Sequence, residues 1–236
     1  MSAFALPGLP GRLADTGLFT GLTAAELTGV VASASLRRLN KGATIFTQGS
    51  AAERAHILLE GRIRILQTDE DGAQVIMRFI GPGETFGTVG LFTDHFYPAH
   101  AVCVTDCVEI SWTEADLLEL MARHALIAMN LVKIIGARLQ EAQDRLRELA
   151  TQRAEQRIAR ALLRLAEQAG HSTESGTAID FPLSRKDLAE MCGATLHTVS
   201  RTLTAWEKSG TVTTHHQRII IRELAEIRRR ASQAPS

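Results

Sequence analysis

The sequence predicts an α+β fold with three consecutive parts: a β domain, a long helix, and a small C-terminal domain of helices with a β hairpin. Three observations support this division. Residues from about 36 to 112 form short apolar runs that glycines and acidic turns separate. Residues 113–151 contain no proline and a single glycine, and residues 184–221 contain two short helical patterns before an alternating segment. Strands followed by helices are typical of this fold class.

The first part has the pattern of antiparallel strands. Isoleucine and arginine alternate over residues 62–65, which is the period of a half-buried strand. The segment TDEDG that follows has hairpin-turn residues, with Asp71-Gly72 suited to positive φ. Several short strands at this spacing predict a small antiparallel barrel or jelly roll.

The second part carries apolar residues at alternating spacings of four and three. They are Ala128, Val132, Ile135, Leu139, Ala142, Leu146 and Leu149, called the α-helical seam below. This heptad pattern predicts a two-stranded coiled coil. Residues 140–147 are nearly all polar outside the seam, so the narrow stripe needs a partner helix, most simply that of a second copy. A long amphipathic helix packed on its own domain is the alternative.

The third part predicts two helices around a tight turn. A helical segment at 157–170 and a loop leading to a short strand come first. Ser184 and Asp187 then form a capping-box pattern, Gly193 marks the turn, and Thr195 can cap the next helix. Residues 211–222 alternate around a turn as a β wing would. Together, the two helices, the turn and the wing predict a winged helix-turn-helix.

The second helix of this motif has an unusual polar face. Helical spacing places His197, Ser200 and Arg201 together. An arginine can grip O6 and N7 of guanine, while serine and histidine can each make one hydrogen bond to a base or phosphate. Further DNA-binding candidates are Thr195 and Thr198, suited to phosphates beside a helix N-terminus, and Arg185. An ordinary solvated helix face would more often carry Glu and Lys.

Charge and composition agree with a nucleic-acid partner. From Arg153 onward the chain has 13 Lys and Arg against 9 Asp and Glu, whereas the preceding part has 13 against 17. A basic C-terminal part suits a polyanion such as double-stranded DNA. No apolar run approaches the ~18 residues of a membrane span. The N-terminal segment lacks the charge of a secretory signal, and three cysteines favour a reducing compartment, so we expect a cytoplasmic protein without membrane contact.

The whole order of parts resembles the bacterial CRP/FNR family of transcription regulators, over residues 15–228. Matching segments are LFTGLTAAEL, GPGETFGTVGLF and HTVSRTL. The resemblance implies a cyclic-nucleotide-binding-like sensor domain (1–123), a dimerisation helix (124–152) and a DNA-binding domain (153–236). It also implies a homodimer on a palindromic operator with TTG half-sites, acting with RNA polymerase as an activator or a repressor. Ser200 and Arg201 carry over as thymine and guanine readers, but His197 stands where relatives have Glu.

The resemblance also predicts where an effector binds. The candidate pocket residues are Phe86, Thr88, Leu91, Tyr97, Pro98 and Ala99. The family's cyclic-nucleotide pocket has a Gly-Glu pair and an Arg-Ser or Arg-Thr pair, where this chain has Thr88 and Pro98-Ala99. A buried phosphodiester without its arginine would cost several kcal/mol, so we do not expect cyclic AMP. An iron–sulfur cluster on four cysteines is not expected either, because the chain has three.

The segment FYPAHA resembles the NnrR and DNR branch, which responds to nitric oxide and is thought to bind haem. His56, His95, His100 and His124 are the candidate axial ligands, with His95 and His100 favoured because they bracket the former phosphate position. A redox-responsive or other small-molecule regulator without haem is the alternative. Cys103, Cys107 and Cys192 are expected to be buried, with a redox pair of Cys103 and Cys107 left open.

Two other readings are weaker. HILLEG, residues 56–61, resembles part of a cupin metalloenzyme motif, but Arg54 occupies the position of its first histidine, so we do not expect an enzyme. His215 and His216 would point to opposite faces of a strand, which favours phosphate contact over metal binding. A sensor that acts through protein contact alone, without DNA, stays open.

Overall fold

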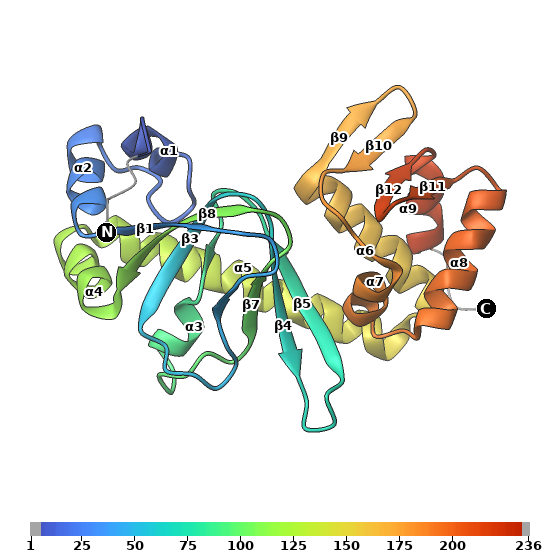
Figure 1. Cartoon of the computed structure of the whole chain (residues 1–236), viewed down its shortest axis with the longest axis horizontal. Helices are drawn as coiled ribbons and strands as arrows, with labels where there is room; N and C mark the ends of the chain where they lie inside the picture. The colour runs from blue at the N-terminus through green and yellow to red at the C-terminus, as the bar shows by residue number, and fades with distance from the viewer. Residues whose placement is uncertain (1–5, 233–236) are drawn as a thin grey trace. The chain divides into compact units, whose positions relative to one another are not determined.

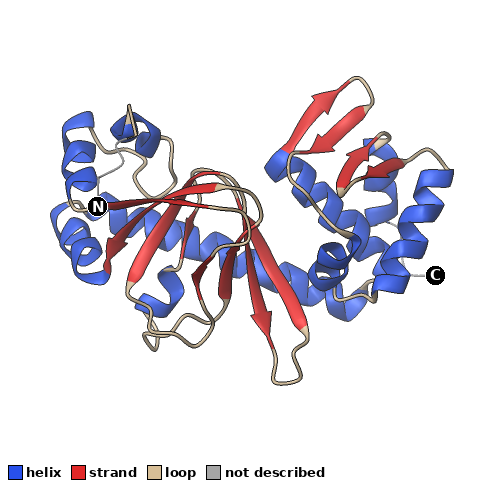
Figure 2. Ribbon diagram, viewed as in Figure 1, coloured by secondary structure: helices blue, strands red, loops and turns tan. Residues whose placement is uncertain are grey.

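The computed structural model describes residues 6–232. Residues 1–5, which belong to the segment assessed for a secretory signal, and residues 233–236, the end of the predicted third part, lie outside the described residues. The chain divides into two compact units. One comprises the residues up to Asp71 with Arg78–Gln140, and the other comprises Gly72–Met77 with the residues from Glu141 onward. The predicted α+β class is confirmed (Figures 1 and 2).

The N-terminal half of the chain is a jelly roll with helices before, within and after its strands. Its helices are α1 (Leu9–Ala14), α2 (Ala24–Ala32), α3 (Thr88–Leu91) and α4 (Glu114–Arg123). Its strands are β1 (Ser35–Leu39), β2 (Thr44–Phe46), β3 (Arg54–Glu60), β4 (Ile63–Thr68), β5 (Gln74–Ile80), β6 (Thr85–Phe86), β7 (His100–Cys103) and β8 (Cys107–Thr113). They form two sheets with the orders β1-β8-β3-β6 and β2-β7-β4-β5. Strand β8 therefore lies between β1 and β3, with Ile110 opposite both Leu36 and Ile57.

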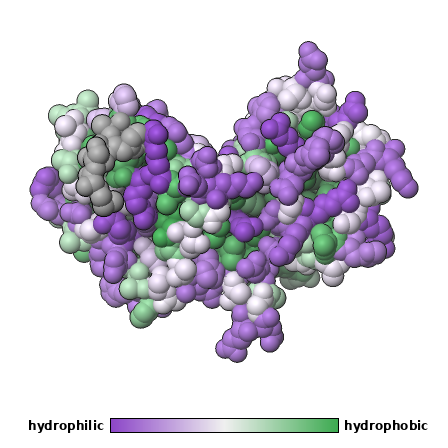
Figure 3. All heavy atoms as spheres, in the orientation of Figure 1, coloured by the Kyte–Doolittle hydropathy of each residue, from purple (hydrophilic) through white to green (hydrophobic). Residues whose placement is uncertain are grey.

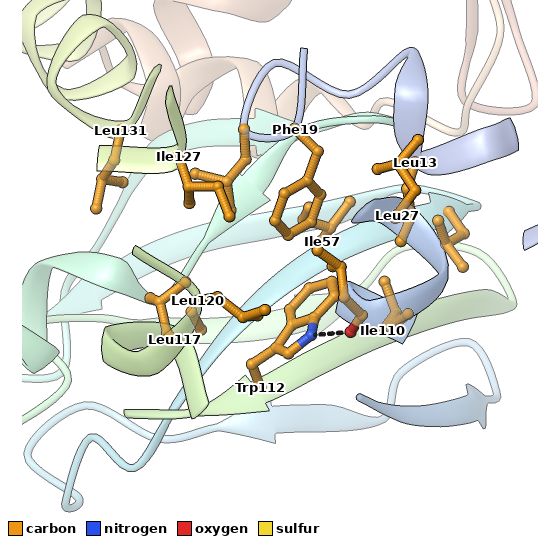
Figure 4. Close-up of a cluster of buried hydrophobic side chains, with 14 of the residues drawn as sticks. Leu13, Phe19, Leu27, Ile57, Ile110, Trp112, Leu117, Leu120, Ile127 and Leu131 are labelled. Atoms are coloured by element: carbon orange, nitrogen blue, oxygen red, sulfur yellow. Dashed lines mark hydrogen bonds between the residues drawn. The ribbon is translucent and has the colours of Figure 1, made fainter. Parts of the chain in front are cut away.

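A large apolar core joins the helices to the first sheet (Figure 4). Trp112 on β8 is fully buried, and its ring lies edge-on to Phe19, with centroids 5.1 Å apart. The indole N–H donates to the Val30 carbonyl oxygen at 2.8 Å, so the one polar atom of the side chain is satisfied. Burying an aromatic or leucine side chain stabilises by roughly 1.5–3 kcal/mol. This core therefore positions α1, α2 and α4 against the sheet.

One detail of the β4–β5 hairpin differs from the sequence pattern, and one agrees with it. Arg62 precedes β4 and is only 6 % exposed, so the expected alternation with outward arginines is wrong at this residue. The reason is a glycine on another segment: a Cβ at Gly81 would lie 2.5 Å from Nη1 of Arg62, so only glycine leaves room for the guanidinium. The hairpin turn itself is confirmed, with Gly72 at φ 81°.

The long helix follows α4 after a sharp bend. Thr113 caps α4 in a capping box with Asp116, and His124 leaves the helical conformation before α5 (Ala125–Thr151) begins. In residues 6–232 no single helix has the length and apolar content of a membrane span, and α4 and α5, which meet those criteria only as a pair, are bent by 115°.

The C-terminal residues form helices around a small sheet. The helices are α6 (Ala154–Ala169), α7 (Arg185–Cys192), α8 (Leu196–Lys208) and α9 (Leu224–Ser232), and the strands are β9 (Gly170–Thr173), β10 (Gly176–Ile179), β11 (Val212–His215) and β12 (Arg218–Ile221). The sheet order is β11-β12-β10-β9. The predicted wing, β11–β12, is confirmed. The expected loop before β10 is wrong, because residues 170–173 pair with β10 and extend the sheet.

Polar residues cover most of the face that Figure 3 shows, with apolar residues in patches between them. Among the described residues 14 large hydrophobic side chains are exposed, and seven of them lie on α5. Half of these exposed apolar side chains therefore belong to one helix.

Candidate nucleic-acid interface

The two helices of the predicted motif begin and end where the sequence indicated. The Ser184 hydroxyl accepts from the Asp187 N–H at 3.0 Å, and the Ser184 N–H donates to the Asp187 carboxylate at 2.9 Å, which completes a capping box at the start of α7. Gly193 ends α7 in the left-handed conformation, at φ 59°. Thr195 then caps α8 by accepting from the Thr198 N–H at 3.1 Å. These local contacts stabilise both helix ends and set the turn between them.

One face of α8 is anchored in the core. Val199, Leu203 and Trp206 are at most 1 % exposed. The Trp206 indole donates to Glu155 Oε1 at 3.0 Å, and the Arg230 guanidinium lies 5.3 Å from the centre of the Trp206 ring. A cation over an aromatic face adds a further attraction. The rotation of α8 about its own axis is therefore defined by these contacts.

The opposite face of α8 is polar and open. It lines a surface pocket of about 380 Å³ formed by His197, Ser200, Arg201, Thr204, Ala205 and Lys208. His197 and Arg201 are exposed, and Ser200 is half-buried. The three predicted base-reading residues thus lie together. Thr204 and Lys208 were missed by the sequence reasoning, although the helical spacing of 201, 204 and 208 would have identified them.

The predicted phosphate-contacting threonines also bond to each other. The hydroxyls of Thr195 and Thr198 are 2.9 Å apart, in addition to the capping bond. A hydroxyl can donate one bond and accept two, so each keeps capacity for a further contact. Leu196, which directly follows Thr195 in the sequence, is 52 % exposed. In the free protein these residues at the start of α8 therefore do not form a buried site.

Arg185 lies at the first position of α7 and faces the wing. Its Nη2 is 3.3 Å from Glu207 Oε2 and 3.4 Å from Thr214 Oγ1. With residues 214–219 it lines a second pocket, of about 230 Å³. A guanidinium paired with a carboxylate is partly neutralised, so its attraction for a phosphate is weaker than that of an unpaired arginine.

The wing tip brings two histidines together. His215 ends β11, but His216 lies in the turn with φ 46°, and their rings are 4.0 Å apart. The expectation that they point to opposite faces is therefore wrong, because it required both to lie on a strand. Over residues 6–232 no three His, Cys, Asp or Glu side chains are grouped so that they could hold a metal ion.

The predicted effector residues lie in the interior of the jelly roll, with one exception. Phe86, Thr88, Leu91, Tyr97 and Ala99 are buried, whereas Pro98 is exposed. The Tyr97 ring stacks on Phe46 at 3.8 Å, its hydroxyl donates to the Arg54 carbonyl at 2.9 Å, and burial raises its pKa. Within the described residues the buried hydroxyls of Thr85 and Thr88 have no hydrogen-bond partner.

A buried polar network next to these residues was missed by the sequence reasoning. The Nδ1 of His56 lies 2.6 Å from Glu109 Oε2, and Nε of Arg37 lies 2.5 Å from Oε1 of the same carboxylate. Burial raises the pKa of Glu109, but the hydrogen bond from His56 and the charge of Arg37 outweigh it and lower the pKa overall. A glutamate within the apolar stretch CVEISW is the signal that could have indicated such a network.

The four candidate haem ligands each have a protein partner. His56 is engaged by Glu109, and His100 Nδ1 accepts from the Gln48 N–H at 3.2 Å. His124 Nδ1 lies 3.2 Å from Glu26, and the exposed His95 lies 3.6 Å from Glu114. An axial ligand needs a ring nitrogen aimed at a cavity that holds the macrocycle. His100 is engaged only through Nδ1, and the exposed His95 lines a surface pocket of about 520 Å³ with Glu53 and Glu114. These contacts single out none of the four histidines as an axial ligand.

The α-helical seam is largely unpartnered in a single chain. Val132 is 64 %, Leu139 59 % and Leu146 68 % exposed. Ile135, Ala142 and Leu149 are exposed too, and only Ala128 is half-buried. The contacts of α5 with the apolar core come from a different face, which carries Ile127 and Leu131.

Comparisons with known proteins agree with a chain that has an N-terminal β domain and a C-terminal helix-turn-helix domain. The family model described as "Cyclic nucleotide-binding domain" matches residues 36–124, and the "Crp-like helix-turn-helix domain" matches residues 156–230. The chain is 31 % identical over 208 residues to the cyclic AMP receptor protein of Thermus thermophilus, covering 88 % of this chain and 93 % of that protein. It is 31 % identical over 191 residues to the nitrogen fixation regulation protein FixK of Azorhizobium caulinodans, covering 80 % and 76 %.

The structure of FixK2 from Bradyrhizobium japonicum has the same fold. The TM-score is 0.75 at 23 % identity, with 86 % of this chain and 99 % of that chain covered. Because family members are transcription regulators, the prediction that the chain is not an enzyme is confirmed. The chain belongs to the CRP/FNR family of DNA-binding transcription regulators, with an effector-binding domain of the cyclic-nucleotide-binding type and a C-terminal helix-turn-helix.

Proposed function

We propose that this regulator binds a palindromic operator as a homodimer and reads its bases through α8. The observation that supports this most directly is the placement of His197, Ser200 and Arg201 on one open face of a helix whose other face is buried. Arg201 contacts guanine, Ser200 contacts thymine, and His197 contacts the remaining base of the half-site. Thr195 and Thr198 hold phosphates at the N-terminus of α8.

The second copy is held through the α-helical seam. Its apolar residues repeat every 3.5 positions, which is the geometry that a second identical helix buries about a two-fold axis. The exposure of Val132, Leu139 and Leu146 supports this partner. Two recognition helices related by this axis occupy successive major grooves about 34 Å apart, so the operator is a palindrome.

The effector acts in the jelly roll and is not a cyclic nucleotide. Thr88, Pro98 and Ala99, at the positions that carry the family's ribose and phosphate contacts, supply no charge. The buried, unpartnered hydroxyls of Thr85 and Thr88 are the polar groups available there. An effector shifts the dimer only by its differential affinity for two states, typically ~1–3 kcal/mol.

Nitric oxide sensing through haem is not part of this proposal. The FYPAHA segment supports it, but the contacts of the four histidines single out none of them as an axial ligand. On the family resemblance we propose RNA polymerase as a further partner and the cytoplasm as the location.

Selection from randomised duplex DNA tests the proposal. The purified chain should enrich a palindrome with TTG half-sites, and its affinity for that palindrome should fall steeply with salt, because phosphate contacts release counterions. The palindrome should bind at least ~10³-fold more tightly than random DNA. A chain that enriches no sequence and is not retained on DNA acts through protein contact alone, which overturns the proposal.

A further inference from the structure

Two cysteines meet where the chain passes from one sheet of the jelly roll to the other. Cys103 ends β7, which pairs with β2 and β4, and Cys107 begins β8, which pairs with β1 and β3. Only residues 104–106 separate them. Both side chains belong to a buried apolar cluster that also includes Leu58, Ile63 and Phe86. The structure therefore brings two thiols together inside the domain that binds the effector.

The contacts of the two sulfur atoms are specific. Cys103 and Cys107 lie close enough for each thiol to shift the pKa of the other. Cys107 Sγ also lies 3.4 Å from the Arg62 carbonyl oxygen and 3.3 Å from that of Thr105. Gly61 makes this arrangement possible, because it has φ 92° and a Cβ there would lie 2.8 Å from Cys107 Sγ. The half-exposed Gly61 thus places no side chain over the thiol.

The three cysteines differ in acidity. The hydrogen bond from Cys103 is the largest influence on Cys107 and lowers its pKa to about 7. The same bond, with burial, raises the pKa of Cys103. Burial raises the pKa of Cys192 to about 12. Because the thiolate is the reactive form, these directions favour Cys107 as the nucleophile and Cys103 as the thiol beside it, and they disfavour ionisation of Cys192.

We propose that Cys103 and Cys107 form a redox site that a hydroperoxide oxidises to a disulfide, and that this oxidation changes operator affinity. The Cys107 thiolate attacks one oxygen of hydrogen peroxide: the S–O bond forms, the O–O bond breaks, and hydroxide leaves. The Cys103 sulfur then attacks the sulfenic sulfur, the S–S bond forms, and water leaves with the thiol proton. The two sulfurs lose two electrons, which reduce the peroxide.

The disulfide has a structural consequence close to the effector residues. It replaces the bonds of the Cys107 thiol to the Arg62 and Thr105 carbonyls and links the two sheets covalently at one loop. Phe86, one of the predicted effector residues, packs in the same cluster. Oxidation therefore changes the packing at the position where an effector acts. The change in operator affinity rests on the proposed function, whereas formation of the disulfide does not.

Thiol counting on the full chain tests the site independently of DNA. After peroxide treatment and alkylation in denaturant, peptide mass spectra should show Cys103 and Cys107 joined with the loss of two hydrogens, and Cys192 alkylated. Dithiothreitol should restore all three thiols. Cys192→Ser is the matched control and should form the same disulfide. Three alkylated cysteines, or a sulfinic acid on Cys107 with Cys103 still a thiol, overturns the site.

Two variants distinguish a resolving thiol from a bystander. In Cys103→Ser and Cys103→Ala, Cys107 should stop at the sulfenic acid, which dimedone traps. The rate of oxidation should rise through about pH 7 in the wild type. It should rise only at higher pH in Cys103→Ala, because the bond that lowers the pKa is gone. Using two variants keeps the test valid if one of them fails to fold. An unchanged pH profile overturns the role of Cys103.

Operator binding tests the regulatory half. The affinities of reduced and oxidised protein for the selected operator should differ by about fivefold or more, the scale of allosteric coupling. Cys192→Ser should show the same difference and Cys103→Ser should show none. A disulfide that forms without changing affinity overturns the regulatory half. If the reduced chain bound no operator, the proposed function would be contradicted. The thiol-counting experiment would still test the Cys103–Cys107 site.

Discussion

His56 and Glu109 form a buried hydrogen-bonded pair across two neighbouring strands, with His56 Nδ1 2.6 Å from Glu109 Oε2. Both residues are at most 2 % exposed, and Arg37 from a third strand binds the other carboxylate oxygen. A buried carboxylate is tolerated only where such partners offset its loss of hydration. The pair therefore ties β1, β3 and β8 together at the centre of the first sheet.

Glu109→Gln should destabilise the jelly roll by about 1–3 kcal/mol, because a charge-assisted bond becomes a weaker one. The effect also depends on pH. The folded-state pKa of Glu109 lies below its ordinary 4.5, so its contribution is complete above that value and is lost as the pH falls through the folded pKa. Denaturant titrations at about pH 7 and about pH 4 should show the variant losing less stability on acidification than the wild type.

Glu60→Gln is the matched control for that experiment. Glu60 pairs with Arg12 at 2.7 Å, but the Glu60 side chain is 51 % and the Arg12 side chain 35 % exposed. An exposed pair contributes ~0–1 kcal/mol, so this substitution should change little. Equal losses in the two variants would mean that burial of Glu109 has no special role.

Leu139→Glu should convert the protein to a monomer. Leu139 is 59 % exposed in the single chain and lies in the α-helical seam, so dimerisation would bury a carboxylate from each copy. A buried, unpaired charge costs about 3–5 kcal/mol. Sedimentation should show the monomer, and operator affinity should collapse. Gln140→Glu adds the same charge to an exposed position away from the seam and should remain dimeric. A dimeric Leu139→Glu protein with normal affinity would refute the seam.

Arg201→Ala should weaken binding to the operator by about 1–3 kcal/mol through loss of a bidentate guanine contact. Binding to random DNA should change far less, since that binding depends on phosphates. Titrations with both kinds of duplex measure the difference. Arg228→Ala removes an exposed arginine from α9 and should change neither the affinity for the operator nor that for random DNA. If Arg201→Ala lowered both affinities equally, Arg201 would be a phosphate contact.

His197→Glu should shift the preferred base pair next to the Arg201 guanine toward that of Glu-bearing relatives. An ionised glutamate only accepts hydrogen bonds and suits a cytosine amino group, whereas neutral histidine has one donor and one acceptor. Parallel selections from randomised operators would reveal the change. Lys208→Gln, at the other end of the same pocket, serves as the control. Identical selected sequences for wild type and His197→Glu would show that His197 makes no base contact.

Local features of this fold were predictable from neighbouring residues. The Ser184–Asp187 capping box, the Gly193 turn and the Thr195 cap each involve atoms within four residues of one another, so their spacing in the sequence is their spacing in space. The polar face of α8 and the seam of α5 follow from the fixed geometry of a helix in the same way. These features were sufficient to indicate a winged helix-turn-helix and a long helix with one apolar stripe.

Tertiary structure alone decided which distant residues meet. His56 and Glu109 are 53 residues apart, and strand order and register bring them together. The burial of Arg62 depends on Gly81, and the contact between His215 and His216 depends on a positive φ in the turn. Cys103 and Cys107 are close in sequence, yet their shared burial results from a crossover between sheets. Residue spacing specifies geometry within a helix or turn, whereas pairing across sheets is selected by the packing of the whole domain.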